Sequence, residues 1–343
     1  MTGGRGPDKA FGRGGAAPGT MDGVRPRQPV PERGALLLPV PWAVWAALRL
    51  TGAERGFPLV PALTFTPYAA ATGALPLGAA LLARSRAATA LAAGATVALA
   101  VPVLARARRQ PAAAAGRRLR LVSSNTFHGR ADAGALVDLV AGCDADVLTL
   151  MEVTRDGRDR LVAAGLPGLL PAEHTLLPAD PARLGAGGSV WTRLPVVARS
   201  RAAGHFEQPL LRLALPGGPD VEVTAVHAHP PLPFTAGVRA WEEDLAGLPA
   251  PGGDAVPVLA RDFNASADHA AFRRLVRRGW VDAGRAAGQG LRATWAPVRF
   301  PQPRLTLDHV LVDPRVGVAG LRVVRLPGSD HRALVADLRI PRA

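Results

Sequence analysis

The sequence predicts a mixed α/β domain over residues 118–343, preceded by a region of apolar helices. Short apolar runs with strand-like alternation are interspersed with helical segments from Arg118 onward. Residues 57–83 and 87–105 contain no charged side chain. Residues 1–34 are rich in Gly, Pro and Arg and show no apolar periodicity. We therefore expect three parts: a tail, an apolar helical region and an α/β domain.

The two basic segments flank the apolar region. Residues 1–34 have the composition of a disordered basic tail, and residues 106–117 form a basic, Ala-rich linker. Much of the net charge of +14 lies in these segments. Clustered arginines attract phosphate, but basic segments beside membrane helices are the stronger explanation of the charge. Cys143 is the single cysteine, which excludes an intrachain disulfide and a cysteine-based zinc site.

The apolar region over residues 35–105 predicts transmembrane helices, three in the simplest interpretation. The runs 57–83 and 87–105 are long enough to cross a bilayer, whereas 35–48 is shorter and ends at Arg49, which could snorkel to the interface. Prolines make the middle run irregular. The region starts too late and is too long for a signal peptide. A buried helical hairpin of a soluble protein is the alternative, and the balanced Lys and Arg on the two sides leave the orientation open.

The elements expected after the linker mix strands and helices without regular βαβ alternation. The expected strands lie at residues 119–124, 147–151, 188–191, 221–228, 257–260, 307–312 and 333–338. The expected helices lie at residues 135–141, 241–248 and 268–278. Many hairpin-like returns favour an α/β sandwich.

Polar side chains recur where these strands begin or end, and sites in α/β proteins gather at such ends. They are Asn125, Glu152, His227, Asp262, Asn264, Asp308, Asp330 and His331. Amide and carboxylate oxygens are hard ligands suited to Mg²⁺ or Mn²⁺. Histidines beside aspartates supply oriented proton donors and acceptors. Hydrolysis of a phosphoester needs both, so the set predicts a metal-dependent phosphoesterase.

The same positions carry a resemblance to the endonuclease/exonuclease/phosphatase superfamily, whose members include DNase-I-like nucleases, sphingomyelinases and inositol phosphatases. The resembling stretches occur in the family's order and cover nearly all of residues 118–340. They are Leu121–Asn125, Ala145–Glu152, Thr224–His227, Val258–Ala265, Leu307–Val312 and Gly328–Arg332. The Asp-Phe-Asn and Ser-Asp-His elements are the most specific. The resemblance implies a four-layer α/β/β/α sandwich of the DNase-I-like type.

The resemblance also implies a role for each matching residue. Glu152 matches the metal-binding glutamate, assisted by Asn125, and Asp330 would be a second carboxylate on the metal side. Asp262 matches the aspartate that positions or activates the attacking water. Three further matches concern the substrate and the proton transfers. Asn264 matches the residue that contacts the phosphate, His331 the catalytic histidine held by Asp308, and His227 the histidine on the leaving-group side.

Two features depart from the family's pattern or add to it. Arg261 stands where glycine usually precedes Asp-Phe-Asn. If that position has a positive φ, arginine is strained there; if not, its guanidinium could contact a substrate phosphate. His227 and His229 form a His-x-His pair that could bind zinc, but Pro230 and Pro231 follow in place of further ligands.

The leading hypothesis is a Mg²⁺- or Mn²⁺-dependent phosphodiester hydrolase acting on nucleic acid or a phospholipid headgroup. The alternatives are a phosphomonoesterase of inositol or nucleotide phosphates and a catalytically silent, membrane-anchored binding domain. Residues Phe65–Tyr68 resemble membrane-tethered actinobacterial members of the family, which implies a multi-pass cell-membrane protein with an extracellular catalytic domain. We predict no protein partner.

Overall fold

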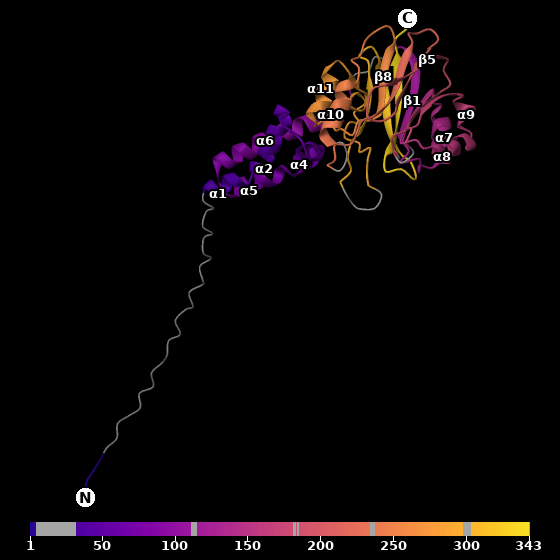
Figure 1. Cartoon of the computed structure of the whole chain (residues 1–343). Helices are drawn as coiled ribbons and strands as arrows, with labels where there is room; N and C mark the ends of the chain where they lie inside the picture. Colours follow the sequence, from indigo (N-terminus) through magenta and orange to yellow (C-terminus); the bar gives the residue numbers. More distant parts are fainter. Residues whose placement is uncertain are drawn as a thin grey trace.

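The computed structural model describes residues 1–4, 32–110, 115–180, 183, 185–233, 237–297 and 303–342. Two six-stranded sheets form the centre of the α/β domain (Figure 1). Sheet A has the order β11-β12-β1-β2-β4-β3, and sheet B has the order β5-β6-β7-β8-β10-β9. In each sheet one neighbouring pair is parallel, β1 with β2 and β7 with β8, and the other pairs are antiparallel.

The strands of each sheet, in chain order, have the following bounds. Sheet A contains β1 (Arg117–Asn125), β2 (Val147–Met151), β3 (Ala172–Leu176), β4 (Gly188–Thr192), β11 (Gly317–Arg325) and β12 (Arg332–Ile340). Sheet B contains β5 (Val196–Ala202), β6 (Gln208–Leu213), β7 (Val221–His227), β8 (Val256–Asp262), β9 (Val281–Asp282) and β10 (Asp308–Val312).

Alternation along the strands builds the core between the sheets. Leu119 and Leu121 of β1 are fully buried against Val223, Val258 and other residues of sheet B. The intervening Val122 belongs to a second apolar cluster on the outer face of sheet A. Because side chains alternate across a strand, each sheet buries both faces, which requires helices outside.

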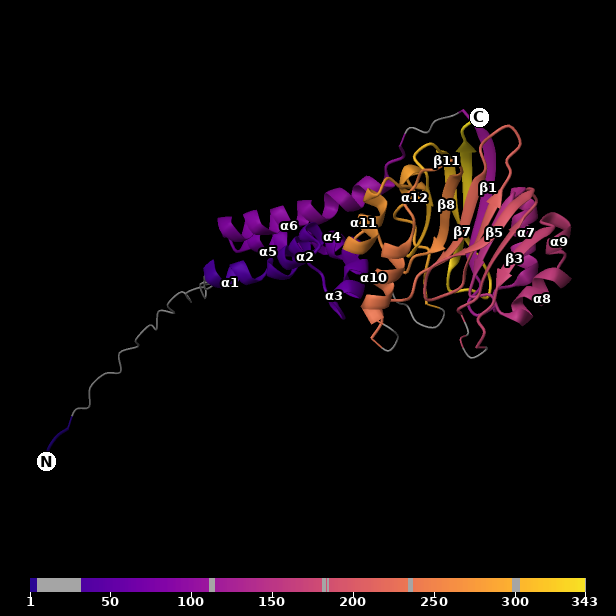
Figure 2. The same ribbon diagram turned by 45° about the horizontal axis from the view of Figure 1, so that its top comes forward.

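Helices cover the outer faces of both sheets and complete the predicted four layers. α7 (Ala133–Cys143), α8 (Arg155–Ala163) and α9 (Leu166–Leu169) lie on sheet A, and α10 (Gly237–Gly247) and α11 (Ala270–Arg277) lie on sheet B (Figure 2). α12 (Ala283–Ala286) packs at the edge of the domain. The side chain of Asp132 caps α7 by accepting a hydrogen bond from the Ala135 backbone N–H at 2.8 Å.

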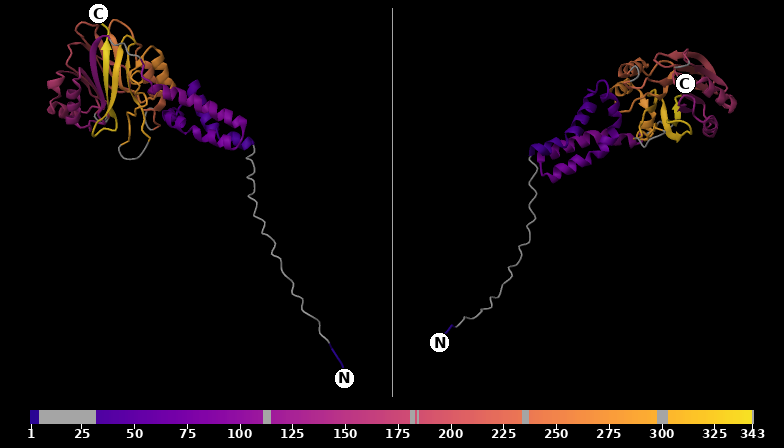
Figure 3. Two further views of the ribbon diagram at one scale, coloured as in Figure 1. Left: turned by 180° about the vertical axis from the view of Figure 1, so that it is seen from behind. Right: turned by 60° about the horizontal axis from the view of Figure 1, so that its bottom comes forward.

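The N-terminal helices form a separate bundle beside α10 and α11 (Figure 3). They are α1 (Glu32–Leu37), α2 (Val40–Thr51), α3 (Leu59–Ala62), η1 (Leu63–Phe65), α4 (Thr66–Thr72), α5 (Ala74–Leu82), α6 (Arg86–Leu104) and η2 (Ala105–Ala107). Residues 5–31 of the predicted tail lie outside the described residues, as do residues 111–114 of the predicted linker.

The three expected transmembrane helices are not all present as such among the described residues. One helix, Arg86–Ala107, is long and apolar enough to cross a bilayer. The segments Leu59–Thr72 and Ala74–Leu82 meet at 45° and would count as a second, broken span. α2 has 12 residues, which is too short to cross. By length and composition, the structure therefore offers one or two candidate spans, which is weak evidence for a membrane.

Arg49 does not extend toward a membrane interface, the position suggested for it by the sequence. Its side chain is buried, and its Nε lies 2.6 Å from a carboxylate oxygen of Asp268 in the α/β domain. Arg106 bonds to the same carboxylate, with its Nη1 donating at 2.8 Å. The start of the predicted linker is thus part of a buried ion-pair network that joins the helical bundle to the domain.

Candidate active site

Strand register brings the predicted residues together at one end of the two sheets. His227 and Asp262 are partners in the parallel pair β7–β8, and Asp308 opposes Asp262 in the antiparallel pair β8–β10. The three side chains share the face of sheet B that is apolar further along each strand, so they lie at the end of the inter-sheet core. Asn125 occupies the matching end of β1 in sheet A.

Asn125 links two carboxylates. Its Nδ2 donates to Glu152 Oε1 at 2.9 Å and to Asp262 Oδ2 at 3.1 Å, and its Oδ1 accepts from the Phe127 backbone N–H at 2.8 Å. Glu152 has a φ of 56°, a backbone conformation uncommon for a side chain of this size. Strain of this kind persists where the surrounding bonds determine it, and it is frequent in active sites.

His331 and Asp308 form a buried pair. The His331 Nδ1 lies 2.9 Å and 3.1 Å from the two carboxylate oxygens of Asp308, and its Nε2 lies 3.6 Å from Asp262 Oδ2. The bond to Asp308 fixes the ring orientation and directs Nε2 toward Asp262. Burial alone would lower the pKa of His331, but the charges of Asp308 and Asp262 raise that pKa to about 9.

Burial and nearby charges shift the pKa values of the other ionisable groups in different directions. It raises the pKa of Asp262, with an opposing contribution from His331. Burial also lowers the pKa of His227 to about 4, so this imidazole is neutral at neutral pH. For Asp308, the nearby charges of Arg261 and His331 outweigh burial and hold the pKa well below its usual range. Two histidines of opposite protonation state thus flank one carboxyl group.

Arg261 resolves the alternative left by the sequence. Its φ is +113°, so arginine occupies a backbone conformation that favours glycine. Its guanidinium is fully buried between the sheets, where Nη1 donates to the carbonyls of Ser123 and Arg332 at 2.9 Å. It lies behind Asp308 and does not line the cleft, so it is not placed to contact a substrate phosphate.

Asn264 and Asp330 complete the predicted set. Asn264 Nδ2 donates to the Ala228 carbonyl at 2.9 Å, and its backbone N–H donates to Asp262 Oδ1 at 3.0 Å. Asp330 Oδ2 accepts from Trp295 Nε1 at 3.0 Å. Its other oxygen, Oδ1, is buried and has no hydrogen-bond partner among the described residues. Such a buried oxygen requires a partner, for which a cation is suitable.

These residues border one cleft of about 690 Å³. Six of the eight predicted residues line it, and Asn125 and Asp308 lie directly behind them. The remaining wall is largely apolar and includes Phe65, Phe127, Phe206, Leu232 and Trp295. Pro61, Thr64 and Phe65 come from the N-terminal helical bundle, which therefore forms part of the wall.

The donor set fits a divalent cation. Two groups of three side chains each offer ligand atoms that lie within 4.8 Å of one another. One group is Glu152, His227 and Asp262, and the other is Asp262, Asp308 and His331. The unpartnered oxygen of Asp330 borders the same cleft. Carboxylate oxygens predominate, as hard cations prefer. A cation against Asp262 would favour its ionised form and offset the effect of burial.

Sequence reasoning missed three contributors. His128 donates its backbone N–H to Glu152 Oε2 at 2.9 Å, and its Nδ1 lies 3.3 Å from the same oxygen. Trp295 holds Asp330, and Phe206 packs on His227 with ring centroids 4.5 Å apart. The one sequence feature that could have indicated His128 is its position three residues after Asn125. His229 belongs to neither of the groups of possible metal ligands among the described residues; its backbone N–H donates to Asp244, and its ring stacks on Phe206.

Comparison with known proteins agrees with this arrangement. The model of the family described as Endonuclease/Exonuclease/phosphatase family matches residues 122–331, more than half of the chain. A family protein of that description from Leptotrichia buccalis C-1013-b aligns with a TM-score of 0.52 at 14% identity, over 65% of this chain and 100% of that chain. Humanized D. rerio TDP2 aligns with a TM-score of 0.51 at 16% identity, over 65% and 99%. At these identities the similarity concerns the fold. No curated protein sequence matches the chain.

Proposed function

Because this chain belongs to the endonuclease/exonuclease/phosphatase family, we propose that it hydrolyses phosphodiesters with a bound Mg²⁺ or Mn²⁺ ion and the His331–Asp308 pair. One observation carries the proposal: the His331 Nε2 and the Asp262 carboxylate lie 3.6 Å apart in a cleft that also exposes Glu152. A proton donor, a proton acceptor and a metal-binding carboxylate thus face one space.

Each residue has a distinct role in this proposal. Glu152 and Asp330 hold the ion, whose charge would offset the negative charge of the phosphate oxygens. Asn125 orients Glu152 and Asp262, because its amide already bonds to both carboxylates. Asp262 accepts a proton from the attacking water.

The two histidines and Asn264 act on the phosphate. His331 is cationic at neutral pH and donates a hydrogen bond from Nε2 to a phosphate oxygen, while Asp308 keeps its ring in place. Asn264 donates a hydrogen bond from its side-chain amide to a phosphate oxygen. His227 is neutral, and its Nε2 lies 3.9 Å from Asp262 Oδ2, on the side of this carboxylate away from His331. It interacts with the leaving-group oxygen.

The charge of the cleft favours a diester over a monoester. Among the described residues that line it, none is arginine or lysine, and three are carboxylates: Glu152, Asp262 and Asp330. A monoester carries up to two negative charges and is usually bound by arginine or lysine. A diester carries one, which a single ion and His331 can offset. A phosphomonoesterase is therefore the weaker candidate.

The same composition favours an amphiphilic lipid over nucleic acid as the substrate. A nucleic-acid site needs basic side chains along successive phosphates. Here the cleft wall is apolar, and Phe65 reaches it from a helical segment that is itself a candidate span. We propose that the protein is anchored in the cell membrane through α6 and the Leu59–Leu82 segment, with the catalytic domain outside, and acts on a lipid phosphodiester.

The test uses the full chain in detergent micelles with Mg²⁺ or Mn²⁺. The substrates are bis(4-nitrophenyl) phosphate, 4-nitrophenyl phosphate, a long-chain phosphodiester lipid in mixed micelles, and single-stranded DNA. We expect hydrolysis of both diesters and faster turnover of the lipid than of DNA. Phe65→Ala should reduce lipid turnover more than aryl diester turnover, whereas Phe57→Ala, at an exposed position outside the cleft, should change neither. Faster hydrolysis of the monoester would replace the diester proposal, and a preference for DNA would remove the lipid substrate.

A further inference from the structure

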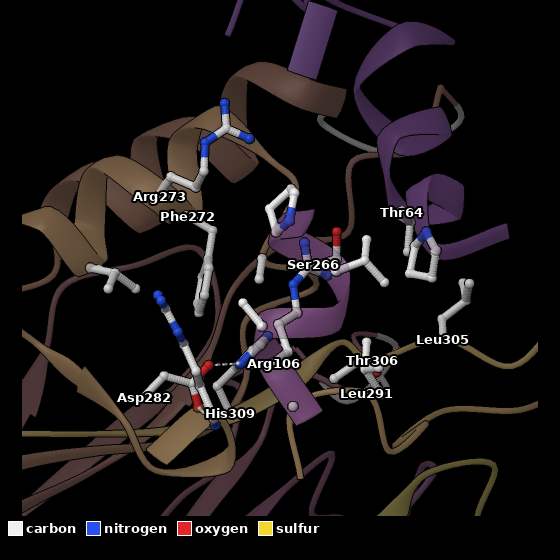
Figure 4. A pocket seen from close by; sticks show the side chains of 18 of the residues that line it. Thr64, Arg106, Ser266, Phe272, Arg273, Asp282, Leu291, Leu305, Thr306 and His309 are labelled. Atoms are coloured by element: carbon white, nitrogen blue, oxygen red, sulfur yellow. Dashed lines mark hydrogen bonds and ion pairs between the residues drawn. The ribbon is translucent and has the colours of Figure 1, made fainter. Parts of the chain in front are cut away.

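A second cavity lies between the helical bundle and the α/β domain and shares Thr64 with the catalytic cleft. It has a volume of about 500 Å³. In Figure 4, Phe272 and Arg273 of α11 border one side, Thr64 and Leu305 border the opposite side, and Arg106 lies between them. The cavity is therefore built by both parts of the protein.

The cavity has a large excess of positive charge. Of the described residues, six arginines line it and one carboxylate does, that of Asp282. Asp282 is already engaged, because its Oδ2 lies 3.0 Å from His309 Nδ1 and its Oδ1 accepts from the Gly284 backbone N–H at 2.8 Å. Asp268 lies behind the cavity and pairs with both Arg49 and Arg106, so its single charge offsets one of the two.

The other four arginines have no carboxylate within ion-pair distance in the part of the chain that the structure describes. They are Arg273, Arg277, Arg285 and Arg304. The guanidinium of Arg273 donates to the backbone carbonyls of Asp268 and Arg49. Burial and the charge of Arg49 lower the pKa of Arg273, as expected where positive charges face one another. An anion placed in this cavity would relieve that repulsion.

The rest of the lining is mostly apolar, with Thr64, Ser266, Thr306 and His309 as polar members. Phe272 and Leu291 lie on the domain side, and Pro67, Pro102 and Val103 lie on the helical side. Val103 belongs to the last turn of α6, the one continuous helix among the described residues that is long enough to cross a bilayer. The cavity thus lies where a candidate span ends, with apolar side chains of that helix on one side and the four arginines that lack a described carboxylate partner on the domain side.

We propose that this cavity binds the phosphate headgroup of an anionic lipid, with the acyl chains lying along α4 and α6. Planar guanidinium groups recognise phosphate oxygens, and arginine near a membrane surface attracts anionic headgroups. The inference rests on the proposed membrane association but not on the proposed chemistry. Thr64 and Leu305 border both cavities, so a lipid bound here would hold one wall of the catalytic cleft in place.

The experiment measures the melting temperature of the full chain in non-ionic detergent with EDTA, so that no lipid is hydrolysed. The probes are dihexanoyl phosphatidylglycerol, dihexanoyl phosphatidylcholine and inorganic phosphate. A ligand that binds only the folded state raises the melting temperature, and we expect a rise of about 5 °C with the anionic lipid at saturating concentration. We expect no rise with the zwitterionic lipid, and a smaller rise with phosphate.

The variants place the effect in this cavity. Arg277→Gln with Arg285→Gln should abolish the rise. Arg274→Gln with Arg278→Gln, at exposed positions at the same end of α11 but outside the cavity, should keep it. No rise, an equal rise with phosphatidylcholine, or an equal rise in both double variants would overturn the proposal. An equal rise with inorganic phosphate would assign the site to a soluble anion. Hydrolysis of bis(4-nitrophenyl) phosphate, measured separately, reports the proposed function and is independent of these results.

Discussion

The Nε atom of Arg261 lies 3.1 Å from the Oδ1 atom of Asp308, and both side chains are fully buried. With regular strand alternation, Arg261 would face the helices of α10 and α11. Its φ of +113° reverses the side chain, so that the guanidinium reaches the carbonyls of Ser123 and Arg332 on the opposite sheet. A cation on the far side of Asp308 thereby keeps this carboxylate ionised opposite His331.

Arg261→Met should destabilise the α/β domain strongly. Removing one member of a buried ion pair leaves the other charge unpaired and costs about 3–5 kcal/mol of unfolding free energy. The measurement is denaturant unfolding. Arg158→Met is the control, because Arg158 is partly exposed and pairs with Glu173 at 2.6 Å, which predicts a loss of about 0–1 kcal/mol. Equal losses in the two variants would show that Arg261 is not a stabilising counter-charge.

The stability of the folded chain without metal should be greatest near pH 6.5. The folded pKa of His331, about 9, exceeds the usual value of about 6.5. The folded state therefore holds an extra proton between these values, and the contribution of His331 is lost as pH rises from 6.5 to 9. His227 and His269 have folded pKa values of about 4, so stability also falls as pH drops from 6.5 to 4.

Melting temperature measured against pH in EDTA tests both limbs. His331→Gln should make the alkaline limb shallower, and it should change the acid limb less, through the loss of the His331 charge beside His227. His269→Gln should make the acid limb shallower, with His227 still contributing to it, and leave the alkaline limb unchanged, because His269 is buried away from the cleft, with its Nε2 2.8 Å from the Val60 carbonyl. An alkaline limb of unchanged slope in His331→Gln would mean that His331 is not protonated in the folded state at neutral pH.

Asp268→Asn should loosen the helical bundle from the α/β domain. Asp268 is fully buried and pairs with Arg49 and Arg106, so its loss leaves two unpaired guanidinium groups, at a cost of about 3–5 kcal/mol. Trypsin should then cut near Arg106–Arg109 faster than in the wild type. Asp159→Asn, at a partly exposed pair with Arg158, is the control and should leave cleavage unchanged. Resistance to trypsin in Asp268→Asn would contradict the role of this network.

Glu152→Gln should weaken the dependence of turnover on metal without unfolding the domain. The amide keeps the size of the side chain and can still accept from Asn125, but it removes the negative charge that attracts a cation. The metal concentration for half-maximal rate should rise by about 10-fold or more, because loss of a residue that merely orients a ligand already costs about 10–100-fold in metal affinity. An unchanged metal titration would exclude Glu152 as a ligand.

The candidate site could be predicted largely from sequence because strand ends are local features. Asn125, Glu152, His227 and Asp262 each follow an apolar run, and strand pairing places such ends side by side. The edge strand β5 was not predicted, because its residues alternate poorly and five of its seven positions are exposed. The position of Asp330 against Trp295 depends on a contact between residues 35 apart, which no local pattern reveals.

The helical region shows the limit of composition as a guide. Residues 57–83 have the uncharged length of a span, yet prolines divide them into α3, η1, α4 and α5. Hydropathy indicates whether a segment is apolar and long enough to cross a membrane. It does not indicate with which residue a charged side chain will pair. Arg49 illustrates this, since its partner Asp268 is 219 residues away. Likewise, the direction of Arg261 depends on a single backbone angle.

The most direct test of the central claim is the rate at which the purified full chain hydrolyses bis(4-nitrophenyl) phosphate with Mg²⁺, with Mn²⁺ and with EDTA, beside His331→Ala. The expected result is turnover that requires the metal and falls by roughly 10²–10³-fold in the variant, the usual cost of removing one donor to an oxygen on which charge develops. Turnover that persists in EDTA, or that His331→Ala leaves unchanged, would contradict it, as would a folded wild-type protein with no metal-dependent hydrolysis of any phosphodiester.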